Sequence, residues 1–363
     1  MKILILSNHY LTLRIFRREL IQEMAKNHEV VISLPEDEKE YMDELRSFGA
    51  RLVFLKNMDR RAINPIEDLK LIKEYKRLLK DEKPDKVITY TIKCNVYGAY
   101  ACKKLNIPCY CNITGLGSAF YNGGLVKFIT SMLYKYTMNK AKVVFFENKG
   151  NEKTLLDMKI FKPEQTYVLN GAGVNLNRFP FTEYPQDNGK ISFLFFARIM
   201  REKGVDELFY AIEKLADEYD NLEFNFIGIY EDEYENKVNE LEKKGLIKYF
   251  GFQKNVVPYI QQCNCVILPS YHEGMANTLL ESASIGRPII TSNIHGCMEA
   301  VVDGKSGYLA KVEDKEDLYR KIKQFIELPY EEKIIMGKSA RNHMEDIFDK
   351  NKVVSETIRI ING

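Results

Sequence analysis

Residues 265–288 read CVILPSYHEGMANTLLESASIGRP, and their pattern indicates the fold class of the chain. The apolar run 265–268 predicts a buried strand that ends at Pro269. A helix follows from about Ala276, and Gly286 and Pro288 mark its end. A strand that passes through a short loop into a helix is the repeating unit of a parallel sheet covered by helices. The first N–H groups of that helix lack partners within it, so they predict an anion-binding site at the carboxyl end of the strand.

The same alternation of short apolar runs and longer helical patterns continues in both directions. It predicts an α/β protein whose parallel sheets carry helices on both faces. The expected strands are 3–6, 30–33, 52–55, 87–90, 109–113, 143–146, 167–169, 191–197, 223–227, 248–250, 265–268 and 288–291. The expected helices include 13–26, 66–80, 125–139, 205–219, 232–244, 277–285 and 349–361.

Two stretches rich in Gly, Asn and Pro interrupt this alternation, at 170–175 and 184–190. We therefore expect two doubly wound, Rossmann-like domains, residues 1–174 and 175–348, with the helix in 349–363 packing back on the first. Ligands of such sheets bind outside the carboxyl ends of the strands. Two domains that face each other would enclose a central cleft for two substrates.

Composition excludes several classes of protein. The chain has 363 residues, of which 45% are hydrophobic and 29% charged, so it can bury sizeable cores. No apolar run is long enough to span a membrane, and the apolar start is too short for a signal peptide. Seven cysteines in a chain of this length do not suggest a disulfide scaffold, and they fit a reducing cytosol.

Motifs of the common cofactor sites are absent or incomplete. The segment 115–120, GLGSAF, has two of the three glycines of a dinucleotide fingerprint but ends in Phe120, and no P-loop is present. The cysteines at 109, 111, 263 and 265 lack histidines at zinc spacing and are expected to be buried free thiols. The acidic run 231–233 is expected to be the solvated start of a helix. We predict neither a cofactor nor a metal.

Two glutamates flank the predicted anion site, Glu273 in the loop and Glu281 two turns into the helix. A carboxylate accepts hydrogen bonds from two hydroxyl groups at once, which suits a sugar or a ribose. Gly274 allows a ligand to approach the backbone closely. Ordinary loop and surface charges would give the same spacing, and the strand–loop–helix context favours a binding site.

A cationic element follows the strand expected at 191–197. Arg198 stands at the end of that strand, and Lys203 precedes a helix that starts at Gly204. Both cations are expected to project toward the same site as the two glutamates. A diphosphate needs such charge, and arginine can bind phosphate oxygens bidentately. The alternative is surface charge on an ordinary loop.

These two elements resemble the retaining glycosyltransferases of family 4, which have the GT-B fold. Glu273 and Glu281 match the E-x7-E motif of that family, and Arg198, Lys203 and Gly204 match its R-x4-K-G pattern. The resemblance extends over essentially the whole chain. Segments 90–98 (YTIKCNVYG) and 112–118 (NITGLGS) are similar to the bacterial subgroup that extends lipid-linked saccharides, including transferases of N-acetylgalactosamine to polyprenyl-diphosphate-linked sugars. Cys94 stands where that subgroup often has proline, and 7–10 (SNHY) where many members have a glycine-rich loop.

The resemblance implies a UDP-sugar donor, a polyprenyl-diphosphate-linked saccharide acceptor and a role for each motif. It assigns Arg198 and Lys203 to the donor diphosphate, Glu273 to the donor sugar and Glu281 to the ribose. The other binding residues that it implies are Gly274, Met275, Ala276, Asn277 and Thr278 around the donor, Phe252 beside the base, and Asn8, His9, Lys93, Asn95, Gly115, Gly117 and Ser118 in the first domain.

The chemistry of sugar transfer fits these residue types. Breaking a sugar–phosphate bond builds negative charge on the diphosphate, which fixed cations and amides stabilise without a divalent metal. Retention of configuration leaves two routes open. One is attack on the front face of the sugar, and the other uses Glu273 as a nucleophile.

Charge is unevenly distributed along the chain. Residues 1–172 hold 29 Lys and Arg against 20 Asp and Glu, whereas residues 173–363 hold 24 against 31. Residues 86–146 contain eight lysines and no acidic residue, and within them 124–136 (GLVKFITSMLYKY) mixes lysines with apolar residues at helical spacing. Arg14, Arg17 and Arg18 add further cations.

Such surfaces attract anionic lipid, so we expect a cytoplasmic protein on the inner face of the cell membrane. The alternative is that the apolar faces pack on the sheet and the lysines are merely solvated. Nucleic acid is not an expected partner, because the basic stretch lacks arginine and no recognition motif accompanies it.

Two other functions fit the same architecture. A nucleotide-sugar epimerase would convert the donor alone, whereas a transferase releases nucleotide only when an acceptor or water takes the sugar. A non-catalytic sugar-nucleotide-binding protein would bind the donor without turnover.

Overall fold

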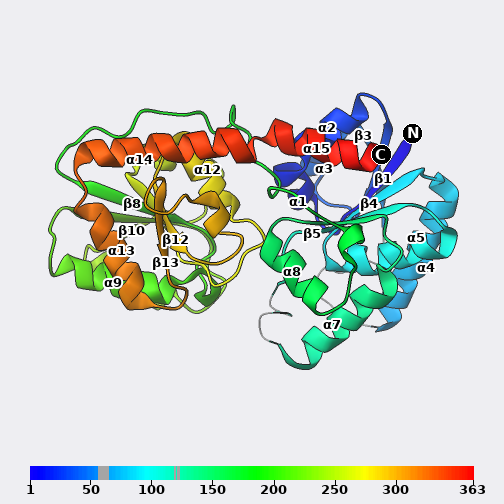
Figure 1. Cartoon of the computed structure of the whole chain (residues 1–363), viewed down its shortest axis with the longest axis horizontal. Helices are drawn as coiled ribbons and strands as arrows, with labels where there is room; N and C mark the ends of the chain where they lie inside the picture. The colour runs from blue at the N-terminus through cyan, green and yellow to red at the C-terminus, as the bar shows by residue number, and fades with distance from the viewer. Residues whose placement is uncertain (56–64, 118–119, 121–122) are drawn as a thin grey trace. The chain divides into compact units, whose positions relative to one another are not determined.

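The computed structural model describes residues 1–55, 65–117, 120 and 123–363, which form two compact units (Figure 1). The first unit contains Met1–Gly173 together with Lys350–Gly363, and the second contains Val174–Asp349. Each unit has its own parallel sheet, which confirms the prediction of an α/β protein with two doubly wound domains.

The first unit has a sheet with the strand order β3-β2-β1-β4-β5-β6-β7, in which all neighbours are parallel. The order changes direction between β1 and β4, so the topological switch point lies between these strands. The strands are β1 (Lys2–Leu6), β2 (Glu29–Leu34), β3 (Ala50–Phe54), β4 (Lys86–Tyr90), β5 (Cys109–Ile113), β6 (Val143–Phe146) and β7 (Thr166–Val168).

Helices cover both faces of this sheet, and β1 shows how the sequence divides between them. Ile3 and Ile5 belong to one hydrophobic core, whereas Leu4 and Leu6 belong to the other, as the two-residue period of a strand requires. The first core is completed by α1 (Tyr10–Phe16), α2 (Arg18–Ala25), α3 (Lys39–Ser47) and α15 (Lys350–Asn362). The second is completed by α4 (Pro65–Glu82), α5 (Ala99–Leu105), α7 (Gly124–Thr137) and α8 (Lys149–Asp157).

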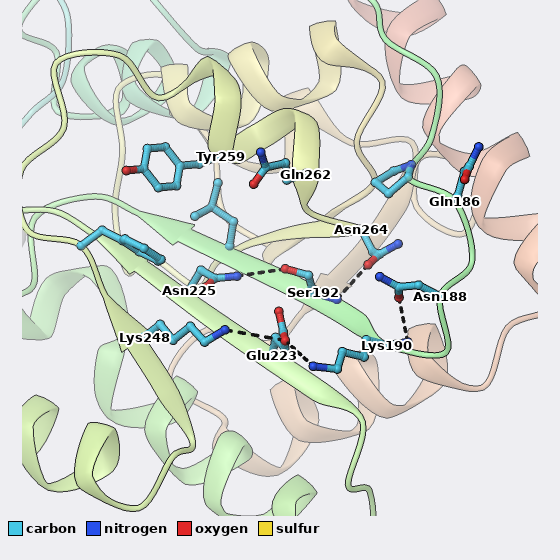
Figure 2. Close-up of a pocket in the computed structure, with 13 residues that line it drawn as sticks. Gln186, Asn188, Lys190, Ser192, Glu223, Asn225, Lys248, Tyr259, Gln262 and Asn264 are labelled. Atoms are coloured by element: carbon cyan, nitrogen blue, oxygen red, sulfur yellow. Dashed lines mark hydrogen bonds and ion pairs between the residues drawn. The ribbon is translucent and has the colours of Figure 1, made fainter.

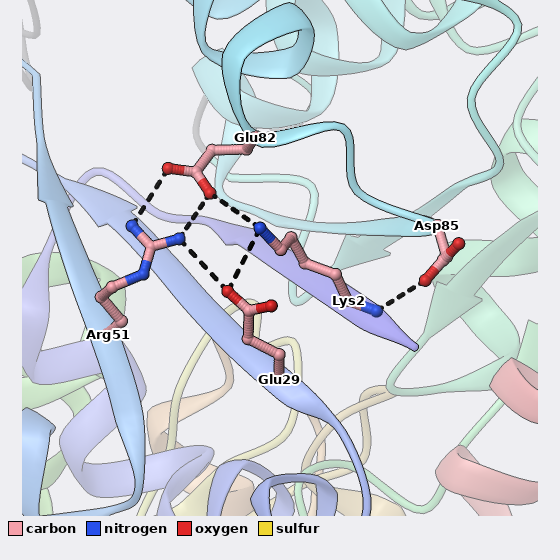
Figure 3. Close-up of polar contacts among 5 residues, drawn as sticks. All are labelled: Lys2, Glu29, Arg51, Glu82 and Asp85. Atoms are coloured by element: carbon pink, nitrogen blue, oxygen red, sulfur yellow. Dashed lines mark hydrogen bonds and ion pairs between the residues drawn. The ribbon is translucent and has the colours of Figure 1, made fainter.

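A network of ion pairs links the amino ends of β1, β2 and β3 to the end of α4 (Figure 3). Arg51 binds both carboxylate oxygens of Glu82, at 3.0 and 2.5 Å, and Lys2 lies 3.4 Å from the same carboxylate and 3.2 Å from Glu29. The hydrogen bonds from Arg51 hold the pKa of Glu82 below its usual value, and Lys2 adds to the effect. The network lies at the end of the sheet opposite to the strand ends that bear the predicted site residues.

The helix expected at 13–26 is in fact two helices, α1 and α2, because the chain bends at Arg17. The bend lets the Arg17 guanidinium enter the protein, where it pairs with Glu147 at 2.6 Å and lies 4.9 Å from the ring centre of Tyr90. Arg14 and Arg18 both pair with Glu44, at 2.5 and 3.1 Å. The expectation that these arginines add to a lipid-binding surface is therefore wrong for Arg17, which is buried, whereas the side chains of Arg14 and Arg18 stay 41% and 39% exposed.

The second unit has a sheet with the strand order β10-β9-β8-β11-β12-β13, again parallel throughout, with its switch point between β8 and β11. Helices α9 and α13 cover one face, and α12 and α14 cover the other (Figure 1). The strands are β8 (Ile191–Phe196), β9 (Leu222–Ile227), β10 (Ile247–Tyr249), β11 (Cys265–Leu268), β12 (Ile289–Ser292) and β13 (Gly307–Ala310). The helices are α9 (Val205–Ala216), α10 (Glu235–Lys243), α11 (Val257–Gln262), α12 (Asn277–Ile285), α13 (Lys315–Ile326) and α14 (Tyr330–His343).

The last helix, α15, belongs to the first unit although the second unit precedes it in sequence. Its buried Ile361 lies in the core of the first unit, and the Ile361 carbonyl accepts a hydrogen bond of 3.1 Å from the Tyr110 hydroxyl. At the other end of the helix, the Lys350 ammonium donates to the Phe16 carbonyl at 3.2 Å.

The structure differs from the sequence-based expectation in two further elements. The edge strand β13 was not expected, because its four residues begin at a glycine and are too few to form a clear apolar run. Helix α10 begins at Glu235 rather than at 232, so the acidic run 231–233 is not helical. All seven cysteines are buried free thiols, as expected for the four at 109, 111, 263 and 265. Among the described helices, none is both long and apolar enough to cross a bilayer.

Candidate functional site

The loops after β8 and β11 meet at the switch point of the second unit. The two strands are neighbours, with Leu194 paired to Val266, and each loop leaves the carboxyl end of its strand. The first loop carries Arg198 and Lys203, and the second carries Glu273 and leads into α12. Open α/β sheets bind their ligands at this position, so topology alone brings the two predicted motifs together.

Backbone contacts hold these two loops against each other. Gly204 has a φ of +71°, and a Cβ atom there would lie 2.1 Å from the Pro269 carbonyl oxygen, so only glycine fits. The Tyr271 N–H donates to the Glu202 carbonyl at 2.9 Å. The Thr278 hydroxyl in the first turn of α12 donates to the Phe196 carbonyl at the end of β8, at 3.2 Å.

Lys203 and Glu273 form an ion pair at this junction. Each side chain is only 14% exposed, and the same oxygen of Glu273 accepts a hydrogen bond of 2.9 Å from the fully buried Ser270 hydroxyl. Behind the pair, burial raises the pKa of the Cys297 thiol, and the Glu273 carboxylate raises it further. That thiol stays protonated and does not supply a nucleophile.

The start of α12 is partly used by the protein itself. The Ala276 N–H donates to the Gly296 carbonyl at 2.8 Å, so the expectation that every N–H from Met275 to Thr278 is available to a ligand is wrong at Ala276. Gly296 packs so closely that a Cβ atom would lie 2.7 Å from the Glu273 carbonyl oxygen. Asn277 and Thr278 are the first residues of α12, and their N–H groups have no acceptor within the helix.

Arg198 lies on the rim of the same junction, with half of its side chain exposed, and pairs with Glu231. The loop after β9 supplies Glu231, and backbone hydrogen bonds join it to the loop after β8. The Ile199 N–H donates to the Ile229 carbonyl at 2.8 Å, and the Glu231 N–H donates to the Ile199 carbonyl at 3.1 Å.

The remaining residues predicted in this unit lie at the same edge of the sheet. Glu281 is half-buried on α12, three residues after Thr278 and therefore on the helix face that meets the end of β8. Phe252 is 66% exposed in the loop after β10, and the Gly251 carbonyl accepts a hydrogen bond of 3.0 Å from the Gly228 N–H after β9.

The residues predicted in the first unit also follow strands of a switch point, here β1 and β4. Asn8 and His9 follow β1, and the His9 ring accepts a hydrogen bond of 3.2 Å from the Leu11 N–H at the start of α1. Lys93 follows β4, and its ammonium lies 3.5 Å from the Asp68 carboxylate. Between β4 and Lys93, Thr91 has a φ of +75°, a strained conformation for a branched residue.

Asn95 does not face a ligand site. It is buried, its amide oxygen accepts a hydrogen bond of 2.6 Å from the Thr89 hydroxyl, and its amide nitrogen donates to the Asn112 carbonyl at 2.8 Å. The expectation that Asn95 binds substrate is corrected to a structural role, since both ends of the amide are used within the unit. Gly115 and Gly117 lie in the loop after β5, and Ser118 lies outside the described residues.

A separate polar pocket of about 320 Å³ lies on the face of the second sheet, near the amino ends of β8, β9 and β10 (Figure 2). Its polar groups are largely engaged with one another. Lys190 and Lys248 share the Glu223 carboxylate, at 3.0 and 3.7 Å, and the backbone N–H and side chain of Ser192 bond to Asn264 and Asn225. None of the predicted donor-binding residues lines this pocket.

Sequence reasoning missed the residues that hold the site residues in place. Ser270 contacts Glu273 from within the same loop, whereas Gly296 and Glu231 contact Glu273 and Arg198 from loops that the motifs do not include. Of these three residues, only Ser270 could have been found from the sequence, because it lies two residues after a buried strand. Glu231 and Gly296 become visible only when neighbouring strands are placed side by side.

Helix α7 of the first unit presents an exposed apolar stripe. Its members recur at the spacing of one helix face and are 37–72% exposed: Leu125, Val126, Phe128, Ile129, Met132, Leu133 and Tyr136. Lys127 and Lys135 lie on the same helix, and the Lys103 ammonium lies 4.5 Å from the ring centre of Tyr136. The alternative in which this apolar face packs on the sheet is therefore wrong for these seven residues.

Comparison with known proteins matches both units to families of glycosyltransferases. Residues 2–148 match the family described as glycosyl transferase 4-like, and residues 179–343 match glycosyl transferases group 1. The chain is 27% identical to an N,N'-diacetylbacillosaminyl-diphospho-undecaprenol alpha-1,3-N-acetylgalactosaminyltransferase of Campylobacter jejuni, over 95% of this chain and 94% of that protein. It is 23% identical to the UDP-Gal:alpha-D-GlcNAc-diphosphoundecaprenol alpha-1,3-galactosyltransferase of Escherichia coli, over 92% of this chain and 89% of that protein.

Solved structures share the fold. The Anabaena protein HepE, in complex with UDP and glucose, superposes with a TM-score of 0.79 at 16% identity, over 100% of this chain and 99% of that one. Sucrose-phosphate synthase from Thermosynechococcus elongatus gives 0.81 at 16% identity, over 100% and 98%. With matches to glycosyltransferase families in both units and this fold, the chain belongs to the glycosyltransferases that join a 4-like domain to a group 1 domain in the GT-B fold.

Proposed function

We propose that this enzyme is a retaining glycosyltransferase that moves an N-acetylhexosamine, such as N-acetylgalactosamine, from a UDP-sugar to a polyprenyl-diphosphate-linked saccharide. The observation that carries the proposal is the meeting of Lys203, Glu273 and the start of α12 at the switch point of the second unit. Two relatives whose names specify undecaprenyl-diphosphate-linked acceptors, and a structural neighbour that holds UDP, support the choice of substrates.

The chemistry follows from the charges at that junction. As the sugar–phosphate bond breaks, Arg198 and Lys203 stabilise the growing charge on the diphosphate, together with the first N–H groups of α12. Glu281 accepts hydrogen bonds from the ribose hydroxyls, and Glu273 contacts the donor sugar. The acceptor hydroxyl attacks the same face that the leaving group departs from, or Glu273 first forms a covalent intermediate.

The first unit supplies the acceptor side in this proposal. Lys93 and the loops after β1 and β5 would bind the acceptor, and the strained Thr91 supports a functional loop at this point, since such strain is concentrated at binding sites. His9 stacks on Tyr10, and Tyr10 on Tyr41, with ring centres 5.2 and 4.3 Å apart, which offers apolar faces beside the polar groups.

The α7 stripe would hold the enzyme on the cytoplasmic face of the membrane. Seven exposed apolar side chains are enough to bind a bilayer interface, at roughly 1.5–3 kcal/mol for each large side chain that is fully buried. Each nearby lysine adds about 1 kcal/mol of attraction to anionic lipid. A lipid-linked acceptor requires an enzyme that works at this surface.

Transfer activity tests the donor site. Wild type and variants would be incubated with UDP-N-acetylgalactosamine, UDP-N-acetylglucosamine or UDP-galactose and a polyprenyl-diphosphate-linked saccharide, and UDP release and product would be measured. We expect Lys203→Ala and Glu281→Ala each to lower kcat by about 10²–10³ because each removes a group that binds the donor. Lys243→Ala, an exposed lysine on α10, is the control. Wild-type turnover in either site variant would refute the site assignment.

The same assay separates the alternatives. An epimerase would convert the nucleotide sugar without acceptor and without UDP release. A non-catalytic binding protein would bind the donor in calorimetry and give no turnover with any lipid-linked acceptor.

Vesicle flotation tests the α7 stripe. We expect wild type to float with phosphatidylcholine vesicles that contain phosphatidylglycerol, and the triple variant Leu125→Ser, Phe128→Ser, Met132→Ser to lose at least 10-fold in binding. Ile335→Ser, which changes a residue 62% exposed in the second unit, is the control. Equal flotation of the triple variant and wild type would rule out α7 as the membrane contact.

A further inference from the structure

The acidic run 231–233, which no motif of the donor site includes, faces the loop that carries Arg198 and Lys203. Glu231 pairs with Arg198, and the Asp232 carboxylate accepts a hydrogen bond of 2.9 Å from the Arg201 N–H. Glu233 is exposed and has no polar contact with any other described residue. Two adjacent carboxylates therefore act on the cationic loop, and the third does not.

The backbone of Glu231 is hydrogen-bonded to the loop that carries Arg198. The loops after β8 and β9 continue their pairing beyond the strands, through Ile199 and Tyr230, and the Glu231 N–H is part of that pairing. Arg198 is therefore paired, at the rim of the junction, with a residue whose backbone is hydrogen-bonded to the same loop. The Glu231 side chain is 32% exposed, so solvent and ions reach the pair.

We propose that Glu231 is a positioning residue that competes with the donor diphosphate for Arg198. This inference rests on the proposed function, in which Arg198 binds that diphosphate. Without donor, Glu231 holds the guanidinium extended at the rim of the site. When the diphosphate arrives, Arg198 exchanges the carboxylate for phosphate oxygens, and Glu231 is left as a negative charge beside a bound anion.

This exchange opposes nucleotide binding and favours nucleotide release. A carboxylate a few ångströms from a diphosphate repels it, and the repulsion weakens as salt screens exposed charges. Removing the charge should therefore tighten UDP binding even though Arg198 loses a partner. The same change should slow turnover wherever release of UDP limits the rate, so that KM for the donor and kcat both fall.

Calorimetry with UDP as the ligand tests the proposal on the full-length protein. We expect Glu231→Gln and Glu231→Ala both to bind UDP about 3–10-fold more tightly than wild type at low salt, with a smaller gain at high salt. Glu233→Gln removes the same charge two residues away and is expected to change the affinity less than 2-fold. Thermal unfolding of each variant confirms that it is folded.

A double-mutant cycle distinguishes exchange at Arg198 from a general effect of charge. Arg198→Gln should weaken UDP binding, and Glu231→Gln should give a clearly smaller gain in that background, because competition for Arg198 is gone and only the direct repulsion of the diphosphate remains. Equal affinity of Glu231→Gln and wild type, or an undiminished gain in the Arg198→Gln background, would overturn the inference alone. A wild-type chain that binds no UDP would overturn the proposed function and this inference with it.

Discussion

Single residues at the switch point decide where Lys203 lies. The residue after it, Gly204, adopts a left-handed conformation and packs directly against the Pro269 carbonyl, which fixes the approach of the two loops. The ammonium of Lys203 then reaches Glu273, whose carboxylate is held from behind by Ser270. The geometry of the donor site therefore depends on a residue that carries no chemistry of its own.

Gly204→Ala should disrupt this geometry. The new methyl group would clash with the Pro269 carbonyl and the backbone would be strained, so we expect a loss of about 3 kcal/mol or more in the free energy of unfolding. Gly245→Ala has nearly the same φ, +72°, and no atom within 4 Å of the new Cβ, so it should cost only about 1–2 kcal/mol. Thermal unfolding measures both changes, and similar losses would show that the contact with Pro269 is unimportant.

At this scale the sequence predicted the residues of the motifs but not their partners. Glu273, Lys203 and Arg198 were found because they follow strands whose apolar runs are easy to recognise. The burial of Asn95 was not predicted, because an asparagine after a strand has the same sequence signature whether it faces a ligand or a neighbouring strand. Its hydrogen bonds to Thr89 and Asn112 depend on which strands are adjacent.

Among the elements, the terminal helix α15 depends on polar contacts as well as on its apolar face. Glu356 on this helix pairs with Arg359 at 2.7 Å and accepts a hydrogen bond from the Tyr167 hydroxyl on β7. These contacts lower the pKa of Glu356 to about 2, with the hydrogen bond from Arg359 as the largest cause. The carboxylate therefore stabilises the folded state only while it is ionised.

Glu356→Gln should give a pH-dependent loss of stability. The pKa of Glu356 is about 2 in the folded state and about 4.5 in the unfolded chain, so its contribution is complete above pH 4.5 and is lost as the pH falls toward 2. Because the pair is partly exposed, we expect a loss of only about 0.5 kcal/mol at pH 7. Chemical denaturation of wild type and variant at pH 7 and pH 3 measures the difference, which should shrink at pH 3. An equal difference at both values would contradict this account.

Most elements were predictable because their apolar residues repeat with a clear period. The exceptions have local causes. The break between α1 and α2 falls at Arg17, which pairs with the distant Glu147, and a helical pattern in the sequence contains no sign of this long-range contact. Strand β13 has only four residues, and its assignment requires β12 as a neighbour. The sequence did not determine whether the apolar face of α7 packs on the sheet or contacts a membrane, since an apolar stripe predicts burial without specifying what covers it.

The whole molecule consists of two units built on the same plan, and each places its predicted site residues after the carboxyl ends of its strands, several of them at the switch point of the sheet. The plan followed from the alternation of strands and helices. The strand order could not be predicted from the sequence. It is this order that makes β8 and β11 neighbours and brings the loops after them together.

Ile361→Ala should destabilise one unit and spare the other. Ile361 is 1% exposed in the core of the first unit, so its truncation should cost about 2–5 kcal/mol there. UDP binding to the second unit should be unchanged, and UDP at 100 times its Kd should still stabilise that unit by about 2.7 kcal/mol. Calorimetric unfolding with and without UDP measures both quantities, and Ile335→Ala is an exposed control. A loss of UDP affinity in Ile361→Ala would show that the two units are coupled.

The placement of α15 also sets an order for biosynthesis. A ribosome delivers Met1–Gly173 before Val174–Asp349, yet the fourteen residues that complete the first unit, Lys350–Gly363, emerge only after the whole of Val174–Asp349. The second unit can therefore finish folding while the first unit still lacks α15. Until α15 is made, the apolar surface around Tyr110 in the first unit stays uncovered. Nascent chains stalled before residue 350 should recruit chaperones to the amino-terminal half and not to the half that follows it.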